Sequence, residues 1–439
     1  MALRDRFLKK IRTGQEYILI CSSTNHMLKA EKLIRSSGIN VEMIPTPQGL
    51  GSACTTALLF DSKDKVQVEK LIERHDVAYE GIYPLIKKDR REAWQEVFVY
   101  SISESVLSIL EKVAVDEVLS KEEIITLLSI ESEEEKAALF KAADLMREEC
   151  VGPKVDIRGA IEFSNYCIRS CNYCGLRKEN RKLHRYRMTI DEILAVAYRM
   201  KEMGIKTVIL QSGEDPFYTV ELIEEIIKTI KAELGMRITL SLGERSYEEY
   251  RRFKEAGANN YLLKIEAANQ KLFYKAHPDG DWEKRAKHTR WLKELGYIVG
   301  SGNIIGLPGQ TVEDIAEDIL FFKKYGIHMI GIGPFIPAAN SPWANLNPGT
   351  VDMTLKTLAV TRLVCQNVYI PATTALATLS KEGFIKALRA GTNTIMLIMT
   401  PPIYREKYQI YSNKNMVNLD FAVECIEKAQ RELPSYIKV

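Results

Sequence analysis

The chain carries Cys167-Ile168-Arg169-Ser170-Cys171-Asn172-Tyr173-Cys174 near its middle, which places three cysteines in a CxxxCxxC spacing. Cysteine thiolates are the usual protein ligands of iron–sulfur clusters. Three thiolates can hold three corners of a [4Fe-4S] cube and leave the fourth iron open as a reaction site. Because such a motif needs a structural context, we expect a strand before this stretch and a helix after it.

Two other interpretations of these cysteines are weaker. A structural zinc site takes four protein ligands, and no fourth cysteine or histidine lies close enough in the sequence to complete two CxxC pairs. A disulfide would leave one cysteine of the three unpaired, in a chain that shows no secretory segment. We therefore interpret Cys167, Cys171 and Cys174 as ligands of an iron–sulfur cluster.

The same stretch resembles the signature of the radical S-adenosylmethionine (SAM) superfamily, through Tyr173 before the last cysteine and Gly175 after it. The resemblance implies that the amino and carboxylate groups of SAM chelate the open iron. It implies that electron transfer then splits SAM into methionine and a 5′-deoxyadenosyl radical. A low-potential electron donor of the ferredoxin or flavodoxin type is implied as a partner.

The composition agrees with a cytoplasmic enzyme, which is the class we expect. A length of 439 residues suggests roughly two or three folding units. The net charge of +3, from 61 basic and 58 acidic residues, indicates neither a nucleic-acid nor a membrane partner. The charged first residues do not resemble a signal peptide, and no apolar run reaches the ~20 residues of a transmembrane helix. Eight scattered cysteines indicate a reducing compartment.

Hydrophobic periodicity divides the chain into residues 1–90, 91–155 and 156–439. The first part has the order βαββαβ and predicts a small ferredoxin-like sandwich. Its expected strands are 17–20, 41–44, 56–60 and 78–84, and its expected helices are 27–36 and 65–74. The second part is a charged helical connector, in which Ser120 and Glu123 form a capping box.

The third part alternates strands with amphipathic, helix-length segments eight times. The expected strands are 157–163, 206–211, 237–242, 259–265, 297–303, 328–333, 368–372 and 393–397. Regular βα alternation over ~250 residues predicts an α/β fold, a closed (βα)8 TIM barrel, in which chemistry sits at the C-terminal ends of the strands. The cysteine motif follows the first strand and lies at that end.

Other polar and glycine residues recur at the ends of these strands, where they predict a ring of ligands. Gly213 would let the backbone approach a ligand, and the Glu214 carboxylate can pair with the SAM ammonium. The residues at these ends are Gln211, Ser212, Gly213, Glu214, Thr239, Ser241, Lys264, Glu266, Gly306, Gly331, Gly333, Thr373 and Thr374.

From about Leu119 onward the chain resembles the family of [FeFe]-hydrogenase maturases HydE, in the subgroup that contains biotin synthase and the methylornithine synthase PylB. The matching stretches are IEFSN (161–165), YCGLR (173–177), QSGED (211–215), LSLGE (240–244), GLPGQ (306–310), GIGPFIP (331–337) and IPATTA (370–375). They cover most of the expected barrel.

The resemblance implies roles for individual residues. Cluster ligation falls to Cys167, Cys171 and Cys174, and Tyr173 can shield the cluster and pack on adenine. Thr373 and Thr374 correspond to a family site for small anions or substrate groups. Contacts to SAM are implied for Thr239, Ser241, Glu266, Arg285, Met396 and Tyr408, where the Arg285 guanidinium offers a bidentate fork to the carboxylate.

Three departures from the family pattern concern the substrate. Where the family carries an Arg-His pair, this chain has Lys264-Ile265, which replaces a bidentate fork with a point charge. The family's Pro-Asn-Trp becomes residues 397–399, Leu-Ile-Met. Only Cys425 remains of the C-terminal cysteines that hold an accessory cluster in some members. A substrate other than the hydrogenase precursor is therefore possible.

Residues 17–85 resemble sulfur or selenium carrier-like domains, through Cys21-Ser22-Ser23-Thr24 and the stretch from Pro45 to Cys54. Cys54, in a Gly/Ser loop, can be a low-pKa thiolate that carries a persulfide or selenide. Cys21, at a strand end, is expected to be a buried core residue. A sulfur or selenium donor is then an implied partner.

We therefore expect a radical SAM enzyme that acts on a small sulfur- or metal-containing substrate, as in hydrogenase maturation. The alternatives are a paralogue handling sulfur or selenium, a PylB-like amino-acid mutase, and a cluster or sulfur carrier without turnover. A maturation partner protein belongs to the first of these hypotheses. The cofactors carry the hard chemistry, while the barrel orients SAM and excludes water.

Overall fold

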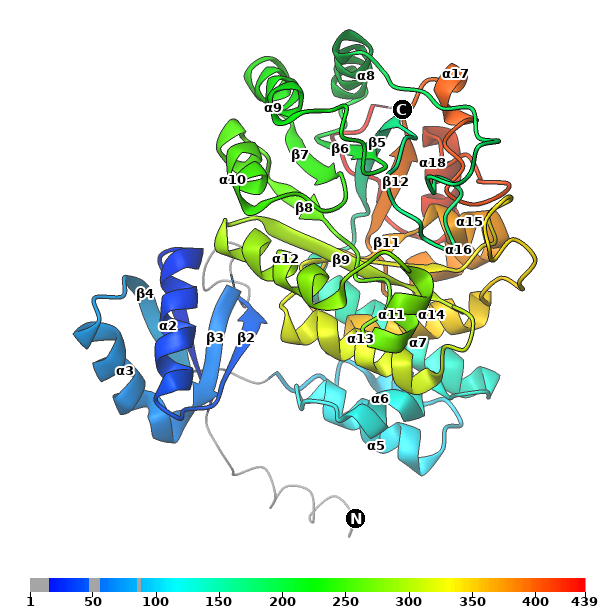
Figure 1. Cartoon of the computed structure of the whole chain (residues 1–439). Helices are drawn as coiled ribbons and strands as arrows, with labels where there is room; N and C mark the ends of the chain where they lie inside the picture. The colour runs from blue at the N-terminus through cyan, green and yellow to red at the C-terminus, as the bar shows by residue number, and fades with distance from the viewer. Residues whose placement is uncertain (1–15, 47–55, 85–87, 439) are drawn as a thin grey trace. The chain divides into compact units, whose positions relative to one another are not determined.

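The structure, a computed structural model, describes residues 16–46, 56–84 and 88–438. These residues fall into two compact units, one within Met1–Lys88 and one within Asp89–Val439 (Figure 1). The helices that follow residue 91 belong to the second unit and share one hydrophobic core with the barrel. No helix among the described residues has the length and apolar character needed to cross a membrane.

The first unit is a four-stranded antiparallel sheet with two helices, and it confirms the expected ferredoxin-like βαββαβ order. The strands lie in the order β2-β3-β1-β4, and all neighbouring strands are antiparallel. Leu19 and Phe60 pack with Ile34 and Val68 in its core. Its elements are β1 (Glu16–Cys21), α2 (Thr24–Ser36), β2 (Val41–Pro45), β3 (Thr56–Asp61), a 3-10 turn (Ser62–Asp64), α3 (Lys65–Arg74) and β4 (Tyr79–Pro84).

The two notable cysteines of this unit differ in what the structure shows of them. Cys21 ends β1 in the core, and burial, followed by the charge of Glu80, raises the pKa of its thiol to about 12. It is therefore a core residue, as expected for this position. Cys54 lies outside the described residues.

The connector forms four helices that pack on the barrel: α4 (Gln95–Phe98), α5 (Glu104–Ala114), α6 (Lys121–Leu128) and α7 (Glu133–Val151). The predicted capping box is present at α6. The Glu123 N–H donates to Ser120 Oγ at 3.2 Å, and the Ser120 N–H donates to Glu123 Oε2 at 2.8 Å. Helix α6 contacts α13 (Val312–Lys324), and α7 contacts α14 (Val351–Cys365), as Figure 1 shows.

Eight parallel strands form the barrel, as the sequence predicts. Their order is β10-β9-β8-β7-β6-β5-β12-β11. Tyr369, just before β11, closes the ring against β10: it accepts the N–H of Ile330 and donates to the carbonyl of His328, both at 2.8 Å. The strands are β5 (Asp156–Ser164), β6 (Thr207–Ser212), β7 (Arg237–Ser241), β8 (Asn260–Leu262), β9 (Ile298–Ile305), β10 (Met329–Pro334), β11 (Pro371–Ala372) and β12 (Thr394–Ile398).

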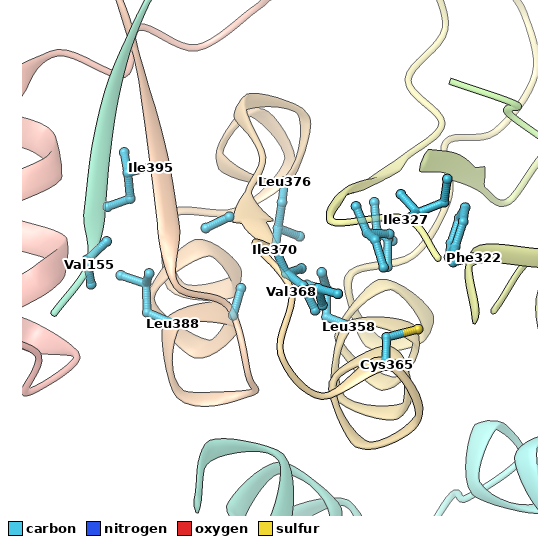
Figure 2. Packing of buried hydrophobic residues seen from close by; sticks show 14 of the residues in the cluster. Val155, Phe322, Ile327, Leu358, Cys365, Val368, Ile370, Leu376, Leu388 and Ile395 are labelled. Atoms are coloured by element: carbon cyan, nitrogen blue, oxygen red, sulfur yellow. The ribbon is translucent and has the colours of Figure 1, made fainter. Parts of the chain in front are cut away.

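Helices cover the outside of the barrel, and their apolar faces bury the strands' outer residues. Figure 2 shows Leu358 of α14 and Leu388 of the later helix α16 (Lys381–Arg389) near Ile370 and Ile395. Burial of such side chains stabilises the fold by about 25 cal/mol per Å² removed from water. The remaining helices are α8 (Ile190–Glu202), α9 (Val220–Thr229) with a π-helical turn (Ile230–Leu234), α10 (Tyr247–Ala256), α11 (Gln270–Ala276), α12 (Trp282–Glu294), α15 (Thr374–Leu379), α16 (Lys381–Arg389), α17 (Pro402–Arg405) and α18 (Leu419–Lys428).

One buried carboxyl group joins the barrel to its outer layer. Asp318 of α13 is 1% exposed and accepts hydrogen bonds from the Ala268 N–H at 2.5 Å and from Asn303 Nδ2 at 2.8 Å. Burial raises the pKa of Asp318 to about 7, although both hydrogen bonds oppose the shift. The folded protein therefore favours the protonated acid, whereas an unfolded aspartate ionises near pH ~3.9.

This carboxyl group should make stability fall as the pH rises. Its contribution is present below about pH 4 and is lost as the pH rises through about 7. We expect the free energy of unfolding to fall by up to about 1.4 kcal/mol per pH unit across this window. Asp318→Asn should remove that slope in denaturant titrations at several pH values, whereas Asp420→Asn, at an exposed position, should keep it. An unchanged slope in Asp318→Asn would contradict this assignment.

Candidate active site

The barrel encloses a cavity of about 390 Å³. It extends from Arg158, near the start of β5, to the cysteine loop that follows the end of that strand. All eight strands or the loops after them contribute to its wall, together with residues 408–414 near the C-terminus. The cavity therefore lies where the strand ends predicted it.

Most of the predicted site residues line this cavity. They are Cys167, Cys171, Tyr173, Cys174, Gln211, Ser212, Gly213, Glu214, Thr239, Ser241, Lys264, Glu266, Arg285, Thr373, Thr374, Met396 and Tyr408. Gly306 lies outside the cavity wall. It adopts a φ of +87°, and a Cβ added there would meet Gly349 Cα at 2.4 Å, so the turn after β9 requires a glycine for its own backbone.

The three motif cysteines are free thiols that face the same cavity. Burial raises the pKa of each thiol, and for Cys171 and Cys174 the charge of neighbouring cysteines adds to this effect. The pKa of Cys174 rises to about 12. Three thiolates held together in a low-dielectric wall need a nearby positive charge, and the irons of a cluster supply one. The donor set therefore fits an iron–sulfur cluster.

Each of these cysteine sulfurs has a close hydrogen-bond contact. The Arg169 N–H donates to Cys167 Sγ at 3.5 Å, and the Leu176 N–H donates to Cys174 Sγ at 3.4 Å. Nδ1 of His277 lies 3.2 Å from Cys171 Sγ. Among the residues that the structure describes, no three His, Cys, Asp or Glu side chains are placed to hold a single metal ion.

Two glycines let the backbone approach the cysteine loop. A Cβ at Gly175 would lie 2.1 Å from the carbonyl oxygen of Gln409, and one at Gly213 would lie 2.1 Å from the carbonyl oxygen of Tyr166. We expected Gly213 to let the backbone approach a ligand. It lines the cavity, but the close approach that requires glycine is to the loop itself.

A charge network joins the cysteine loop to β6, β7 and α12. Arg169 Nε lies 2.5 Å from Glu214 Oε2, so Glu214 is paired with an arginine within the protein. Glu244 binds two guanidinium groups, Arg169 Nη2 at 3.0 Å and Arg285 Nε at 2.7 Å. Burial raises the pKa of Glu244, but the charges of Arg285 and Arg169 outweigh it and hold that pKa at about 2.

A second group lies at the end of β8. Lys264 Nζ is 3.0 Å from Glu266 Oε2, and the Tyr173 hydroxyl donates to Glu266 Oε1 at 3.4 Å. Arg285 Nη1 donates to the Lys264 carbonyl at 2.7 Å. Glu266 adopts a φ of +63°, a strained backbone for a residue with a side chain. Strain of this kind recurs at ligand sites, where the surrounding structure holds it.

Hydroxyl and amide groups on other strands are held in fixed orientations. Asn260 Nδ2 donates to Thr239 Oγ1 at 2.9 Å, and Gln211 Nε2 donates to the Tyr408 hydroxyl at 3.2 Å. Thr373 caps α15 by accepting the N–H of Leu376. These contacts preset the polar positions of the cavity wall.

Sequence reasoning missed several cavity residues. Glu162 of β5 is buried and forms an ion pair with Lys414, which is more than 250 residues away in the sequence. Arg158 lies at the barrel floor, with Nε 2.6 Å from Asp156 Oδ2 and its guanidinium 4.6 Å from the centre of the Tyr369 ring. No local pattern marks a pair that only the closed barrel brings together.

Some of the residues that differ from the family pattern lie in the cavity wall. Lys264 and Ile398 line the cavity, whereas Ile265 and Leu397 are core residues that do not line it. Cys425 is buried in α18, where burial raises the pKa of its thiol to about 11.

Two family models match parts of the chain. Residues 161–322 match the "Radical SAM superfamily", and residues 16–84 match the family described as "Putative Se/S carrier protein-like". The first match covers the cysteine loop and most of the strands that carry the charge network.

Similar proteins include two enzymes and two solved barrels. The [FeFe] hydrogenase maturase subunit HydE of Thermotoga maritima is 47% identical over 306 residues, which is 70% of this chain and 87% of that protein. The 3-methylornithine synthase of Methanosarcina acetivorans is 30% identical over 283 residues, which is 64% of this chain and 80% of that protein. The crystal structure of methylornithine synthase PylB has a TM-score of 0.68 at 26% identity, covering 75% of this chain and 98% of that one. The X-ray structure of the [FeFe]-hydrogenase maturase HydG from Carboxydothermus hydrogenoformans has a TM-score of 0.65 at 25% identity. The match covers 74% of this chain and 78% of that one.

The charge network predicts that Glu244 positions both arginines. Glu244→Gln should weaken SAM binding by roughly ten- to a hundredfold, because the loss of one charged hydrogen-bond partner costs about 1.5–3 kcal/mol. Calorimetric titration of SAM into the reconstituted protein would measure this change. Glu248→Gln, at an exposed residue of α10 that pairs with Arg251, is the matched control and should bind SAM as the wild type does. Equal affinities in the two variants would contradict the positioning role.

Proposed function

Since this chain belongs to the radical SAM superfamily, we propose that it holds a [4Fe-4S] cluster on Cys167, Cys171 and Cys174 and performs HydE-like chemistry in the maturation of the [FeFe]-hydrogenase H-cluster. The chain is a radical SAM enzyme, so an iron–sulfur cluster, SAM, a reductant and a small-molecule substrate are part of its activity. When bound, the reduced cluster and SAM supply a 5′-deoxyadenosyl radical.

One observation carries this proposal. The three cysteines and the residues proposed to contact SAM line the same 390 Å³ cavity, although they come from different strands along the chain. A structural cluster or a sulfur carrier without turnover would need the cysteines but not the surrounding ring of charged and hydroxyl groups. The cavity therefore favours an enzyme that binds SAM beside its cluster.

The protein's own groups suit the charges of SAM. Arg285 and Arg169, held by Glu244, offer guanidinium groups to a carboxylate, and Glu214 and Glu266 offer carboxylates to an ammonium. Thr239, Ser241, Gln211, Ser212, Met396 and Tyr408 supply the remaining proposed contacts. Tyr173 is half-buried in the same cavity wall as the cysteines, where we assign its ring to shielding the cluster.

The proposed substrate is a small sulfur- or metal-containing molecule. The space around Lys264, Thr373 and Thr374 would receive it, because Gly331 and Gly333 on the neighbouring strand leave room there. We assign the reductant to the ferredoxin or flavodoxin type and propose a cytoplasmic location. The free thiols described in both units support a reducing compartment.

The SAM-cleavage step is tested directly. After anaerobic reconstitution, the wild type should bind about four irons per chain and form 5′-deoxyadenosine with dithionite and SAM. Cys167→Ala, Cys171→Ala and Cys174→Ala should each lose the cluster signal and the product. Cys150→Ala, at a half-buried cysteine of α7, is the control and should retain both. An intact cluster that yields no 5′-deoxyadenosine in the wild type would refute the proposal.

The hydrogenase assignment has its own test. Addition of the protein to an assembly mixture that lacks only its HydE component should restore hydrogenase activity. Restoration supports maturation, whereas normal SAM cleavage without restoration points to another substrate. A PylB-like mutase is a second candidate, favoured by the TM-score of 0.68 to that barrel. Such a mutase would convert an added amino acid into a rearranged isomer under the conditions of the SAM-cleavage assay.

The first unit favours a third candidate, an enzyme that handles sulfur or selenium, because residues 16–84 match a carrier-like family. In that case the Cys54 thiolate takes a persulfide-level sulfur or selenium atom from its donor and carries it as a persulfide or selenopersulfide. Cys54→Ala should then abolish transfer into product while 5′-deoxyadenosine still forms. Ser52→Ala, from the same Gly/Ser stretch, is the matched control. Full product formation by Cys54→Ala would exclude the carrier role.

A further inference from the structure

The imidazole of His277 contacts the cysteine loop from outside the motif. Its Nδ1 lies 3.2 Å from Cys171 Sγ, and the side chain is 4% exposed. Within the part of the chain that the structure describes, Cys171 Sγ is the only hydrogen-bond partner of the ring, because Nε2 has none. A thiolate bound to iron carries no proton and can only accept, so Nδ1 must be the donor.

The ring is held in place by its own segment. His277 caps the end of α11, and its N–H donates to the Phe273 carbonyl at 2.7 Å. The imidazole packs edge-on against Tyr173, with ring centres 5.3 Å apart, and tilted against Phe273 at 4.8 Å. A Cβ at Gly280 would lie 2.8 Å from His277 Cβ, so the chain turns tightly beside it.

The same segment is fastened to the cysteine loop at three further points. The Asn172 N–H donates to the Ala276 carbonyl at 2.9 Å, and Asn172 Nδ2 donates to the Lys275 carbonyl at 2.9 Å. The Ser170 N–H donates to Asp279 Oδ2 at 3.1 Å. Residues 275–279 therefore form a second side of the cysteine loop, and these three hydrogen bonds fix the distance between His277 Nδ1 and Cys171 Sγ.

The hydrogen bonds within the cysteine loop explain why Cys171 Sγ takes a donor from outside the loop. Cys167 and Cys174 each receive a backbone N–H from the residue two positions later, Arg169 and Leu176. The residue two positions after Cys171 is Tyr173, and the loop supplies no such backbone donor to Cys171 among the contacts described. His277 thus gives the middle cysteine the donor that the loop gives to the other two.

We propose that His277 is a positioning residue that donates a hydrogen bond to Cys171 Sγ and so raises the reduction potential of the cluster. Reduction adds negative charge to the cluster and its sulfurs, and a hydrogen bond to a ligand sulfur stabilises the more negative state. The inference rests on the proposed cluster ligation by the three cysteines.

The choice of variants separates hydrogen bonding from packing. In His277→Asn the amide nitrogen can occupy the place of Nδ1, so the donor is retained while the ring is lost. In His277→Phe the ring is retained and the donor is lost. A hydrogen-bonding role predicts that Asn resembles the wild type and Phe does not, whereas a packing role predicts the reverse.

The test is a redox titration of the reconstituted proteins, followed by electron paramagnetic resonance of the reduced cluster in the absence of SAM. His277→Phe should have a more negative potential, with the equilibrium constant for one-electron reduction lowered about tenfold, or about 59 mV. His277→Asn should recover most of this shift. An unchanged or more positive potential in His277→Phe, or a shift in His277→Asn alone, would overturn the inference.

A second measurement applies if the Phe variant binds no cluster. In the wild type, isotopically labelled histidine should give a nitrogen hyperfine coupling to the reduced cluster, and the absence of any coupling would overturn the inference. Failure of the proposed function gives a different result, because a wild type without a cubane signal, or without 5′-deoxyadenosine, fails before any potential is compared.

Discussion

The closure of the parallel sheet between β10 and the chain entering β11 is the constraint on which the site depends. Two backbone hydrogen bonds of 2.8 Å at Tyr369 make this closure. Without them, β10 and β11 would be sheet edges with unpaired N–H and C=O groups. With them, the eight strand ends face one interior space. Strand β11 needs only two residues because Tyr369 supplies the pairing before it.

The closed barrel places several charges in a small volume, and each needs a partner. A buried charge without a partner costs far more than an exposed one. Arg169 and Arg285 share Glu244, Lys264 is paired with Glu266, and Lys414 is paired with Glu162. Groups of both signs are therefore held in position before any ligand binds. That arrangement suits a ligand that itself carries an ammonium, a carboxylate and a sulfonium.

The sequence was sufficient to predict the strands and helices of the barrel, because the same βα unit repeats along the chain. Strand and helix periodicity located all eight barrel strands, and the capping box at Ser120 marked the start of α6. Periodicity could not pair Glu162 with Lys414, because their contact depends on how the C-terminal segment returns over the barrel. Gly306 matched a ligand-binding loop by type, but its backbone and the contact with Gly349 explain the glycine. Arg169 was visible in the motif, yet its two carboxylate partners follow other strands.

The two units bear on different questions about function. Every residue that lines the cavity belongs to Asp89–Val439, including the cysteines and the proposed SAM contacts. Among the described residues, the groups that could contact a cofactor in this cavity therefore all come from the second unit. Two features of this chain bear on the substrate instead: Lys264 lines the cavity, and residues 16–84 match a carrier-like family. A lysine in the wall bears on which substrate the cavity accepts, and a carrier-like unit bears on how sulfur or selenium would be delivered.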